Sequence, residues 1–526
     1  MRKKSKVLHM LLSVAMLGGI TAACSSNNNS EVNSTNEAGQ ATPADSASDT
    51  AAGTASTTPG ASVDTSEPYE IVLAFPVFGA VPKDMPAVEE AISKISQEKI
   101  NASVKILPIS IGAWSQQMNL MTSGGEKLDI AYAFGQQGYY STQASTGKII
   151  AIDDLLPTFG SDIEEAVGTE YLSSAKFNGK LYGVPTLHSF TMLPGVYMRK
   201  DLVEKNGIDT SAIKNLDDLN PVLQTIKDNE PGVTPLGVGL NNPFDFYVDY
   251  DKLGDRFGII PKFDNGLKVE NLFETQEYEN LLTKVHSWFK SGFINKDAAT
   301  TQTPVQDLMK AGKTFSYFST ISPGGLEIEQ RLTGKELIYV PLFEQPYTTT
   351  NVVLNGLYTI SQNSENPERT MMFLNLMYSD KEIANLLAWG IEGTDYVKVS
   401  DNIIDYPKGI DSTTVGYSMP VHMVGNPFLT YIFNNDDPDK WIKTKADNDA
   451  ALKSKALGFT FDAEPVKNEM TAINNVMEQY RRALESGTID PANKLQEFRN
   501  KLKAAGLDKV IAEKQKQLDE WATNNK

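Results

Sequence analysis

Cysteine is almost absent from this chain of 526 residues, since Cys24 is the only one. A single thiol excludes intrachain disulfides, and beyond Cys24 the chain offers no thiolate ligand for zinc and no cysteine nucleophile. Histidine is scarce as well, and three of the four lie beyond the first 23 residues, at His188, His286 and His422. Because these are widely separated in sequence, nothing indicates a metal cluster, and we expect neither a metal nor a cofactor.

Sequence motifs of common enzymes are also missing. The chain contains no HExxH, no GxSxG and no GxGxxG after a predicted strand. The segment AGKTF at residues 311–315 ends like a phosphate-binding loop, but Asp307 occupies the position of that loop's first glycine. The acidic segment NNDDPDK at residues 434–440 lacks the central glycine and the terminal glutamate of a calcium-binding hand. We therefore expect no catalysis; since paired carboxylates leave no sequence signature, a surface-anchored glycosidase is an alternative.

Positive charge is in deficit. The formal net charge is −18 with the four cations of the first 23 residues, and −22 without them. Affinity for nucleic acid depends largely on Lys and Arg contacts to phosphates, so we expect no nucleic-acid partner. An acidic surface also repels anionic lipid, and attachment to a membrane would therefore depend on acyl chains.

No stretch of the sequence is long and apolar enough to span a bilayer. The uncharged apolar run at residues 7–20 has about 14 residues, fewer than the ~20 that a membrane-spanning helix needs. It follows four cations and precedes Thr21, Ala22 and Ala23, which is the order of an export signal. With Cys24 next, the segment resembles a bacterial lipoprotein signal, apart from Thr21, where leucine is usual.

This resemblance implies that residues 1–23 are removed and that Cys24 carries acyl chains such as palmitate. Two or three chains, each contributing about 0.8 kcal/mol per buried methylene, would hold the protein at the extracellular face of the cell membrane. A secreted protein with an incidental cysteine is the alternative. Residues 24–67 are rich in Ser, Thr, Asn, Ala and Gly and contain no Lys or Arg. Such a segment cannot bury enough apolar surface to fold, which predicts a disordered tether.

Beyond the tether, the apolar pattern alternates between two periods. Short apolar runs at residues 70–75, 102–107 and 128–134 are typical of buried strands. The segments between them, residues 84–100 and 114–121, have helical spacing. Strand, helix, strand, helix, strand predicts a parallel sheet with helices on its faces.

Later segments predict a second lobe and further helices. Residues 178–202 contain two prolines and no helical period, and a new αβ unit follows them, which predicts a crossover between lobes. Asn366 before a proline, and Ser379 or Asp380, predict the starts of two helices. The last 65 residues contain three amphipathic helices, one of which is expected to start at Asp490.

Several segments together resemble the family 1 extracellular solute-binding proteins of ABC importers. The matching stretches are GEKLDIAYAFGQQGYYSTQASTGKIIAIDDLL at residues 125–156, YGVPTLHSFTMLPGVYMRKDL at residues 182–202 and AWGIEGTDYVKV at residues 388–399. Near the C-terminus, GFTFDAEPVKNEMTAINNVMEQY at residues 458–480 resembles a domain of unknown function found in a lipoprotein subgroup of Gram-positive bacteria. The resemblance covers nearly everything from Tyr69 to Trp521.

The resemblance implies an α/β fold, a two-lobed periplasmic-binding-protein-like (type II) clamp with hinge crossovers and extra C-terminal helices. Lobe one would contain residues 68–190 and 355–400. Lobe two would contain residues 191–354 and 401–526, including the C-terminal helical segment 458–526. A monomer would capture a small-molecule solute, usually an oligosaccharide, without chemical change, and would present its closed form to the membrane subunits of an ABC importer. A binding protein for a peptide or another non-sugar solute, and a ligand sensor for a membrane kinase, are alternatives.

A sugar site requires flat aromatic surfaces flanked by amides, carboxylates and hydroxyls. Side chains of these types follow several predicted strands, and ligands favour the C-terminal edge of a parallel sheet. The candidate ligand-binding residues are Phe78, Trp114, Phe134, Gln136, Tyr139, Tyr140, Tyr197, Ser319, Thr320, Trp389 and Glu392.

A purely structural role is the alternative for these residues. Each candidate tryptophan could instead seal a core, as we expect of Trp288, which has helical spacing with Leu281 and Val285. The acidic segment NNPFDFYVDYDKLGDR at residues 241–256 either rims a sugar site or, in the interpretation that we favour, forms a solvated loop.

Overall fold

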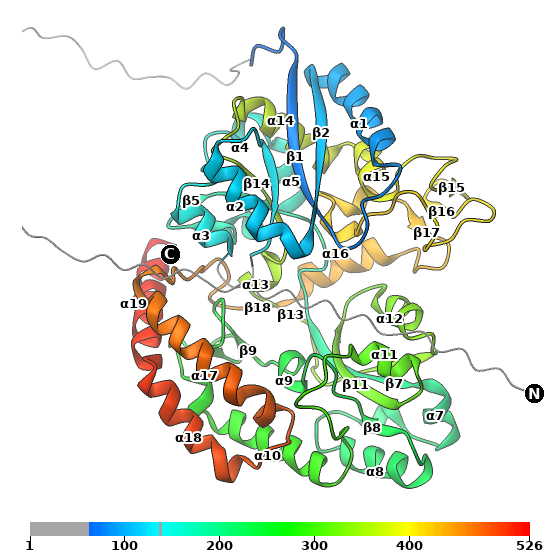
Figure 1. Ribbon diagram of the computed structural model, residues 1–526, viewed down its shortest axis with the longest axis vertical. Helices are drawn as coiled ribbons and strands as arrows, with labels where there is room; N and C mark the ends of the chain where they lie inside the picture. Colours follow the sequence, from blue (N-terminus) through cyan, green and yellow to red (C-terminus); the bar gives the residue numbers. More distant parts are fainter. Residues whose placement is uncertain (1–62, 136–138, 526) are drawn as a thin grey trace, which may run out of the picture. The chain divides into compact units, whose positions relative to one another are not determined.

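The computed structural model describes residues 63–135 and 139–525 (Figure 1). The predicted signal, Cys24, most of the predicted tether and Gln136 lie outside the described residues, and for Tyr139 only the backbone is described. The described residues belong to one compact unit, and none of their helices has the length and apolar character that a membrane span requires.

The first sheet has the strand order β2-β1-β3-β14-β6. Its strands are β1 (Tyr69–Val77), β2 (Ala102–Ser110), β3 (Ile130–Ala133), β6 (Gly183–Pro185) and β14 (Leu357–Ile360). β1 runs parallel to β2 and β3, which confirms the predicted parallel arrangement, and β14 is antiparallel to β3 and β6. Leu73 and Ala74 point to opposite faces of β1 and are both buried, so both faces of the sheet are covered.

Eight helices belong to this first lobe in the described structure. They are α1 (Met85–Ile100), α2 (Trp114–Gly124), α3 (Tyr139–Ser145), α4 (Leu156–Phe159), α5 (Ser161–Val167), α6 (Thr169–Ser173), α14 (Pro367–Ser379) and α15 (Lys381–Trp389). The Asn366 side chain accepts a hydrogen bond from the Arg369 amide, and Asp380 accepts from the amides at the start of α15. Both predicted helix starts are thereby confirmed, because these side chains satisfy amides that have no partner within the helix.

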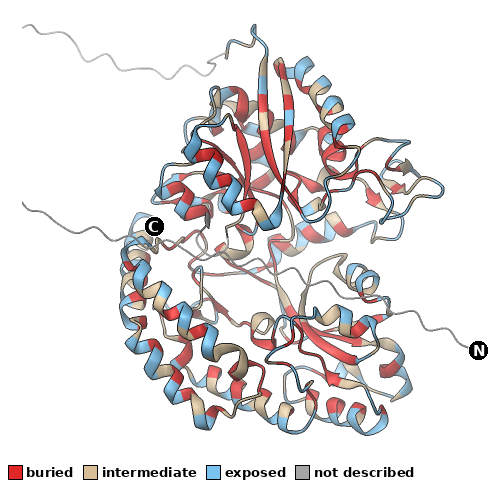
Figure 2. Ribbon diagram, in the orientation of Figure 1, coloured by how far each residue is buried: buried red, intermediate tan, exposed pale blue. Residues whose placement is uncertain are grey.

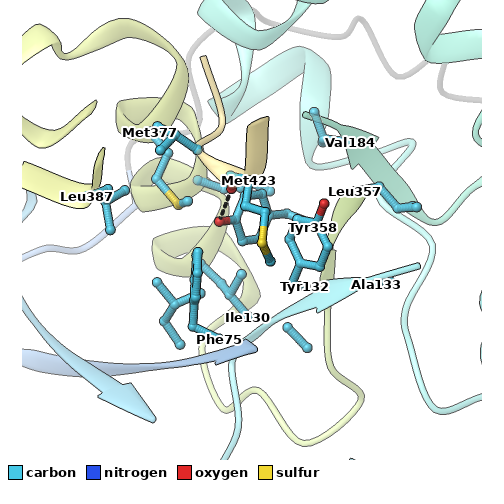
Figure 3. Close-up of a cluster of buried hydrophobic side chains, with 14 of the residues drawn as sticks. Phe75, Ile130, Tyr132, Ala133, Val184, Leu357, Tyr358, Met377, Leu387 and Met423 are labelled. Carbon is cyan, nitrogen blue, oxygen red and sulfur yellow. Dashed lines mark hydrogen bonds between the residues drawn. The ribbon is translucent and has the colours of Figure 1, made fainter. Parts of the chain in front are cut away.

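The core of the first lobe is aromatic at its centre (Figure 3). The rings of Tyr132 and Tyr358 meet edge to face with centroids 5.5 Å apart, and the Tyr358 hydroxyl donates to the backbone oxygen of Met423 at 2.7 Å. Ile404 and Met423 are buried in this core, whereas the sequence assigns residues 401–526 to lobe two. A small sheet follows α15, with strands β15 (Val397–Lys398), β16 (Ile403–Asp405) and β17 (Ile432–Phe433).

The second sheet has the order β12-β7-β11-β8. Its strands are β7 (Leu193–Arg199), β8 (Thr234–Leu236), β11 (Thr314–Ile321) and β12 (Leu337–Pro341). The second lobe also contains α7 (Lys200–Lys205), α8 (Leu219–Asn229), α9 (Pro243–Phe246), α10 (Gln276–Lys290), α11 (Val305–Lys310), α12 (Gly325–Thr333), β9 (Tyr250–Asp251) and β10 (Ile260–Pro261). Trp288 of α10 is buried in this second core, as its spacing predicts.

Three C-terminal helices complete the second core (Figures 1 and 2): the first two pack against α10, and the third packs on those two. They are α17 (Lys467–Glu485), α18 (Pro491–Ala504) and α19 (Leu507–Asn524), which confirms the three predicted amphipathic helices. Asp490 caps α18 through the Ala492 amide, as expected. Ile473, Phe498 and Val510 are fully buried among residues of the second lobe.

Three passages of the chain connect the lobes. Residues 178–202 pass from β6 of the first sheet to β7 of the second, which confirms the predicted crossover. β13 (Tyr347–Thr348) leads back and pairs in parallel with β18 (Leu452–Lys453), which follows α16 (Lys440–Ala450). Asn448 of α16 ties the first passage to the third, because its side chain accepts from the Phe190 amide at 2.8 Å and donates to the His188 carbonyl at 3.0 Å.

Candidate functional site

A cavity of about 860 Å³ lies where several elements of the described structure meet. It is bounded by the C-terminal end of β3, by α13 (Thr350–Val353), by α9, by the loop at residues 254–257 and by α17. The first lobe contributes Gly135, Ser141 and Leu354, the last of which is buried in the first core although the sequence places it at the end of lobe two. Among the described residues, ten of the 23 that line the cavity lie between Phe459 and Arg482, so within the described structure the C-terminal helical segment contributes more of the wall than the first lobe does.

Glycine is required where β3 ends at this cavity. The Gly135 amide donates to the Leu354 carbonyl at 2.8 Å. A Cβ atom at position 135 would lie 2.2 Å from the same carbonyl oxygen, which is a backbone atom that cannot move aside. The close approach fixes the end of the central strand against the C-terminal end of α13, at the edge of the cavity.

The acidic segment at residues 241–256 is not a solvated loop, contrary to the favoured interpretation. The Asn242 side chain accepts from the Phe244 amide at 2.9 Å, and the Asp245 carboxylate accepts from the Asn242 amide at 2.9 Å, which together form a capping box at the start of α9. Asp251 is 1% exposed. The segment turns inward and lines the cavity, because its carboxylates find partners within the fold.

A cluster of four charges joins this segment to α17. Arg256 contacts Asp245 at 2.6 Å and Glu485 at 3.4 Å, and Arg481 contacts Asp245 and, at 2.8 Å, Glu485. The Tyr278 hydroxyl donates to the second oxygen of Glu485 at 3.2 Å. The Glu485 side chain has no exposed surface. Buried charges are tolerated when they are paired and hydrogen-bonded, and these four sum to zero.

The pKa values follow this arrangement. Burial opposes ionisation of Asp245, but Arg481 and Arg256 outweigh it and hold the pKa of the carboxyl below its usual value. Burial likewise opposes protonation of Arg256, and the neighbouring Glu485 raises its pKa above the usual value. Burial, followed by repulsion from Arg256, lowers the pKa of Lys252 to about 8. Asp245 and Arg256 are therefore both ionised at neutral pH.

The third cationic side chain of the cavity wall is held by backbone carbonyls. Arg482 donates to the oxygens of Gly239 at 2.7 Å, Ala299 at 3.0 Å, Ala298 at 3.1 Å and Thr301 at 2.7 Å, and also to that of Leu240. These contacts fix the end of α17 to two loops of the second lobe. They also occupy the guanidinium, as the ion pairs occupy Arg256 and Arg481.

Other polar groups of the wall have no such partners among the described residues. Neither Asn474 nor Glu478 forms a side-chain hydrogen bond or ion pair with a described residue, and both are exposed on α17. The Thr460 hydroxyl is buried beside the cavity and has no hydrogen-bond partner in the described part of the chain. Phe257, Phe459 and Met470 add apolar surface. Apolar walls with a few unpaired polar groups suit a ligand that has both C–H faces and hydroxyls.

Of the sequence-predicted residues whose side chains the structure describes, two flank this cavity. Phe134 and Tyr140 adjoin the lining residues Gly135 and Ser141. Phe134 packs edge to face on Trp114, with centroids 6.4 Å apart. The Tyr140 hydroxyl is buried and donates to the Ala175 carbonyl at 2.5 Å. Trp114 is itself 2% exposed. These aromatic residues support the cavity edge from the core of the first lobe.

The remaining predicted residues lie elsewhere in the described structure. Phe78, after β1, is 57% exposed, and Ser319 and Thr320 are half-buried at the end of β11. Tyr197 is fully buried, whereas Glu392 is exposed and pairs with Lys398.

Trp389 is another predicted residue that lies away from the cavity. It is 9% exposed, and its indole N–H donates to the Tyr431 carbonyl at 3.1 Å. Neither Trp389 nor the residues of the preceding paragraph line the cavity described above. Their contact with a ligand stays a prediction.

Sequence reasoning missed the part of the wall formed by α17. Met470, Asn474, Met477, Glu478 and Arg481 recur at helical spacing, so they lie along one side of this helix. The helical spacing of apolar residues predicted the amphipathic helix, but it did not indicate which side of the helix would face a cavity. The available sequence signal for this side of the helix was the presence of two methionines among its polar residues.

Two family models match the chain. The bacterial extracellular solute-binding protein model covers residues 79–384, and a domain of unknown function, DUF3502, covers residues 455–523. The chain is 31% identical over 460 residues to a carbohydrate ABC transporter substrate-binding protein of Streptococcus pneumoniae, which covers 85% of this chain and 90% of that protein.

Solved structures are similar over the same extent. The crystal structure of the N-glycan transport solute binding protein (NgtS) from Streptococcus pneumoniae has 28% sequence identity and a TM-score of 0.78, and the match covers 88% of this chain and 100% of that one. The same protein in complex with Man5GlcNAc gives a TM-score of 0.67 over 88% of this chain and 100% of that one.

Proposed function

Because the chain belongs to the bacterial extracellular solute-binding protein family, we propose that it captures an extracellular oligosaccharide for an ABC importer and releases it unchanged. The relatives support this assignment, since one is a carbohydrate transporter component and another is an N-glycan transport protein solved with glycans. The family resemblance drawn from sequence is confirmed, and so is the two-lobed clamp.

The single observation that carries the proposal is the cavity of about 860 Å³ with walls from both lobes. A ligand that contacts both lobes at once stabilises only their closed arrangement, and this difference in affinity between open and closed forms drives closure. Membrane subunits of an importer would recognise the closed form.

The chemistry of the wall favours a neutral glycan over an acidic one. The cationic side chains of the lining, Arg256, Arg481 and Arg482, are engaged by carboxylates or carbonyls. Glu478 is a carboxylate without an ion pair, and it would repel a uronic acid while accepting hydrogen bonds from hydroxyls.

The carboxylates of the cavity wall support binding of a glycan without its hydrolysis. Asp245 pairs with two arginines, and Asp255 pairs with Lys514 at 2.6 Å. Glu478 is then the one lining carboxylate, among the described residues, that forms no ion pair. Hydrolysis of a glycosidic bond uses two carboxyl groups with different pKa values, and a single unpaired one does not meet that requirement.

Attachment to the membrane belongs to the same proposal. Cys24 would carry the lipid and residues 24–67 would tether a monomeric clamp at the extracellular face of the cell membrane. The support is the order of cations, apolar run, small residues and cysteine at the start of the chain. Incorporation of labelled palmitate into the wild type but not into Cys24→Ala is the expected result.

Binding of sugars is tested by thermal shift on the protein spanning residues 63–526. The panel contains Man5GlcNAc, maltopentaose, a pentagalacturonide and a pentapeptide. A neutral oligosaccharide should raise the melting temperature, because a ligand at 100 times its Kd adds about 2.7 kcal/mol of stability. Mass spectrometry after overnight incubation should recover the sugar intact. A shift with only the peptide or the galacturonide, or cleavage of the sugar, would contradict the proposal.

A further inference from the structure

Residues 455–523, which match a domain of unknown function, contribute α17 and the segment before it to the cavity wall. Figure 1 shows α17 running along the side of the second lobe, with α18 and α19 beside it. One side of α17 packs into the core through Ile473 and Leu484. Another side, which carries Asn474 and Glu478, lines the cavity. The helix therefore combines a structural face with a face that is free to contact a ligand.

We propose that α17 is part of the ligand-binding surface, with Asn474 and Glu478 hydrogen-bonding hydroxyl groups of the bound glycan. This inference rests on the proposed function and assigns a role to the C-terminal domain within it. The two side chains are four residues apart, so they are neighbours on the helix surface, about 5–6 Å apart at Cβ. Adjacent sugar units of one oligosaccharide can contact both.

Unpaired polar groups at the cavity support this role. The side chains of Asn474 and Glu478 form no hydrogen bond with any described residue, and they are available to a ligand without loss of an existing contact. Thr460, on the segment that leads to α17, lines the same cavity.

The position of α17 is fixed by charge, which prepares the site for binding. One and two turns beyond Glu478, Arg481 and Glu485 join the cluster with Asp245 and Arg256. Arg482 binds carbonyls of two further loops of the second lobe. Because both sets of contacts belong to the second lobe, Asn474 and Glu478 are held in place before the ligand arrives. A rigid site loses less entropy on binding.

Glu478 also acts as a specificity determinant. A carboxylate accepts hydrogen bonds from neutral sugar hydroxyls but repels the carboxylates of uronic acids. Replacement by glutamine keeps an acceptor and removes the charge. We therefore expect Glu478→Gln to narrow the affinity gap between a neutral and an acidic oligosaccharide, whereas a purely structural role would leave that gap unchanged.

The test compares substitutions on the two sides of α17 in the protein spanning residues 63–526. Asn474→Ala and Glu478→Ala remove the proposed contacts. Asn475→Ala and Gln479→Ala are the matched controls, since both residues are exposed on the same helix and neither lines the cavity. Isothermal titration uses Man5GlcNAc or the neutral panel sugar that binds the wild type most tightly, and melting temperatures verify that each variant is folded.

We expect the Kd to rise about threefold to tenfold for Asn474→Ala and more than tenfold for Glu478→Ala, since hydrogen bonds to a charged group are the stronger ones. The controls should stay within about twofold of the wild type. Wild-type binding with equal Kd values in all four variants would overturn the inference and leave the proposed function standing. Failure of the wild type to bind any panel sugar would overturn the proposed function and this inference with it.

Discussion

Glu485 is a buried charge that neighbouring groups compensate. Its side chain has no exposed surface, and it is surrounded by Arg256, Arg481 and the Tyr278 hydroxyl. Removal of one member leaves the other charges buried without compensation, which costs more than the pair contributes when intact.

We expect Glu485→Gln to lower the free energy of unfolding by about 3–5 kcal/mol, because two arginines would then face Asp245 alone. Urea unfolding at pH 7 measures the change. Glu464→Gln is the control, since Glu464 forms an exposed pair with Lys467 that contributes about 1 kcal/mol or less. Similar losses in the two variants would contradict the description of the cluster.

His188 is a second residue whose surroundings have a measurable consequence. Burial lowers the pKa of His188 to about 4; the Thr186 and Val352 carbonyls act in the opposite direction, and the nearby His422 reinforces the effect of burial. Since the folded pKa lies below the ordinary value near 6.5, the unfolded chain takes up a proton between pH 6.5 and 4 that the folded chain does not. Stability is therefore complete above pH 6.5 and falls as the pH drops.

Comparison with His188→Gln isolates this contribution. From pH 7 to pH 5, the free energy of unfolding of the wild type should fall by about 2 kcal/mol more than that of the variant. Urea unfolding at the two pH values measures both falls, and the other titrating groups cancel in the comparison. Equal falls in the two proteins would show that the ring is not held neutral by burial.

At the scale of elements, α16 stabilises the connection between the lobes through one amide side chain. Asn448 is 4% exposed and bonds the backbone of the first crossover at both His188 and Phe190. Its own carbonyl accepts from the Tyr171 hydroxyl at 2.7 Å. The two hydrogen bonds of this one side chain thus connect α16 to the first crossover.

Asn448→Ala should lower the free energy of unfolding by about 2–3 kcal/mol, because a buried amide and a buried carbonyl lose their partners. Lys445→Ala, at an exposed position of the same helix, should change it by less than about 0.5 kcal/mol. Chemical denaturation of both variants beside the wild type provides the measurement. A loss in Asn448→Ala no larger than in the control would mean that the crossovers are held by strand pairing alone.

At the scale of the whole molecule, the C-terminal helices are part of the second core and not an appendage. Phe459, Phe498 and Leu518 are buried together with residues of α10 and of the second sheet. A lobe that shares its core with a later segment cannot fold correctly without that segment.

Truncation after Ser454 should therefore abolish the cooperative unfolding of the second lobe. We expect the truncated chain to bind a hydrophobic dye strongly and to show a reduced calorimetric enthalpy, because the apolar surface that α17 to α19 cover becomes exposed. The protein spanning residues 63–526 is the reference. A truncated chain with the full enthalpy per residue and no dye binding would show that the helices form an independent domain.

The sequence by itself determined the features that depend on neighbouring residues. Asn366, Asp380 and Asp490 marked helix starts because a side chain caps amides only two or three residues away. The first three strands and the crossover at residues 178–202 could be predicted for the same reason, since periodicity and proline act locally. Trp288 was recognised as core from its spacing within one helix.

Only the tertiary structure decided which side chains meet. Asp245 and Arg481 are 236 positions apart, and no local pattern shows that a segment expected to be solvated pairs with a helix near the C-terminus. Aromatic content placed Trp114 and Trp389 among the candidates, but packing put both indoles at 9% exposure or less. Asn474 and Glu478 became candidates because the packing of α17 on the second lobe leaves them at a cavity. How whole elements pack decides which residues are buried and which residues distant in sequence become neighbours. Periodicity describes only the spacing of residues within one element, so it does not contain this information.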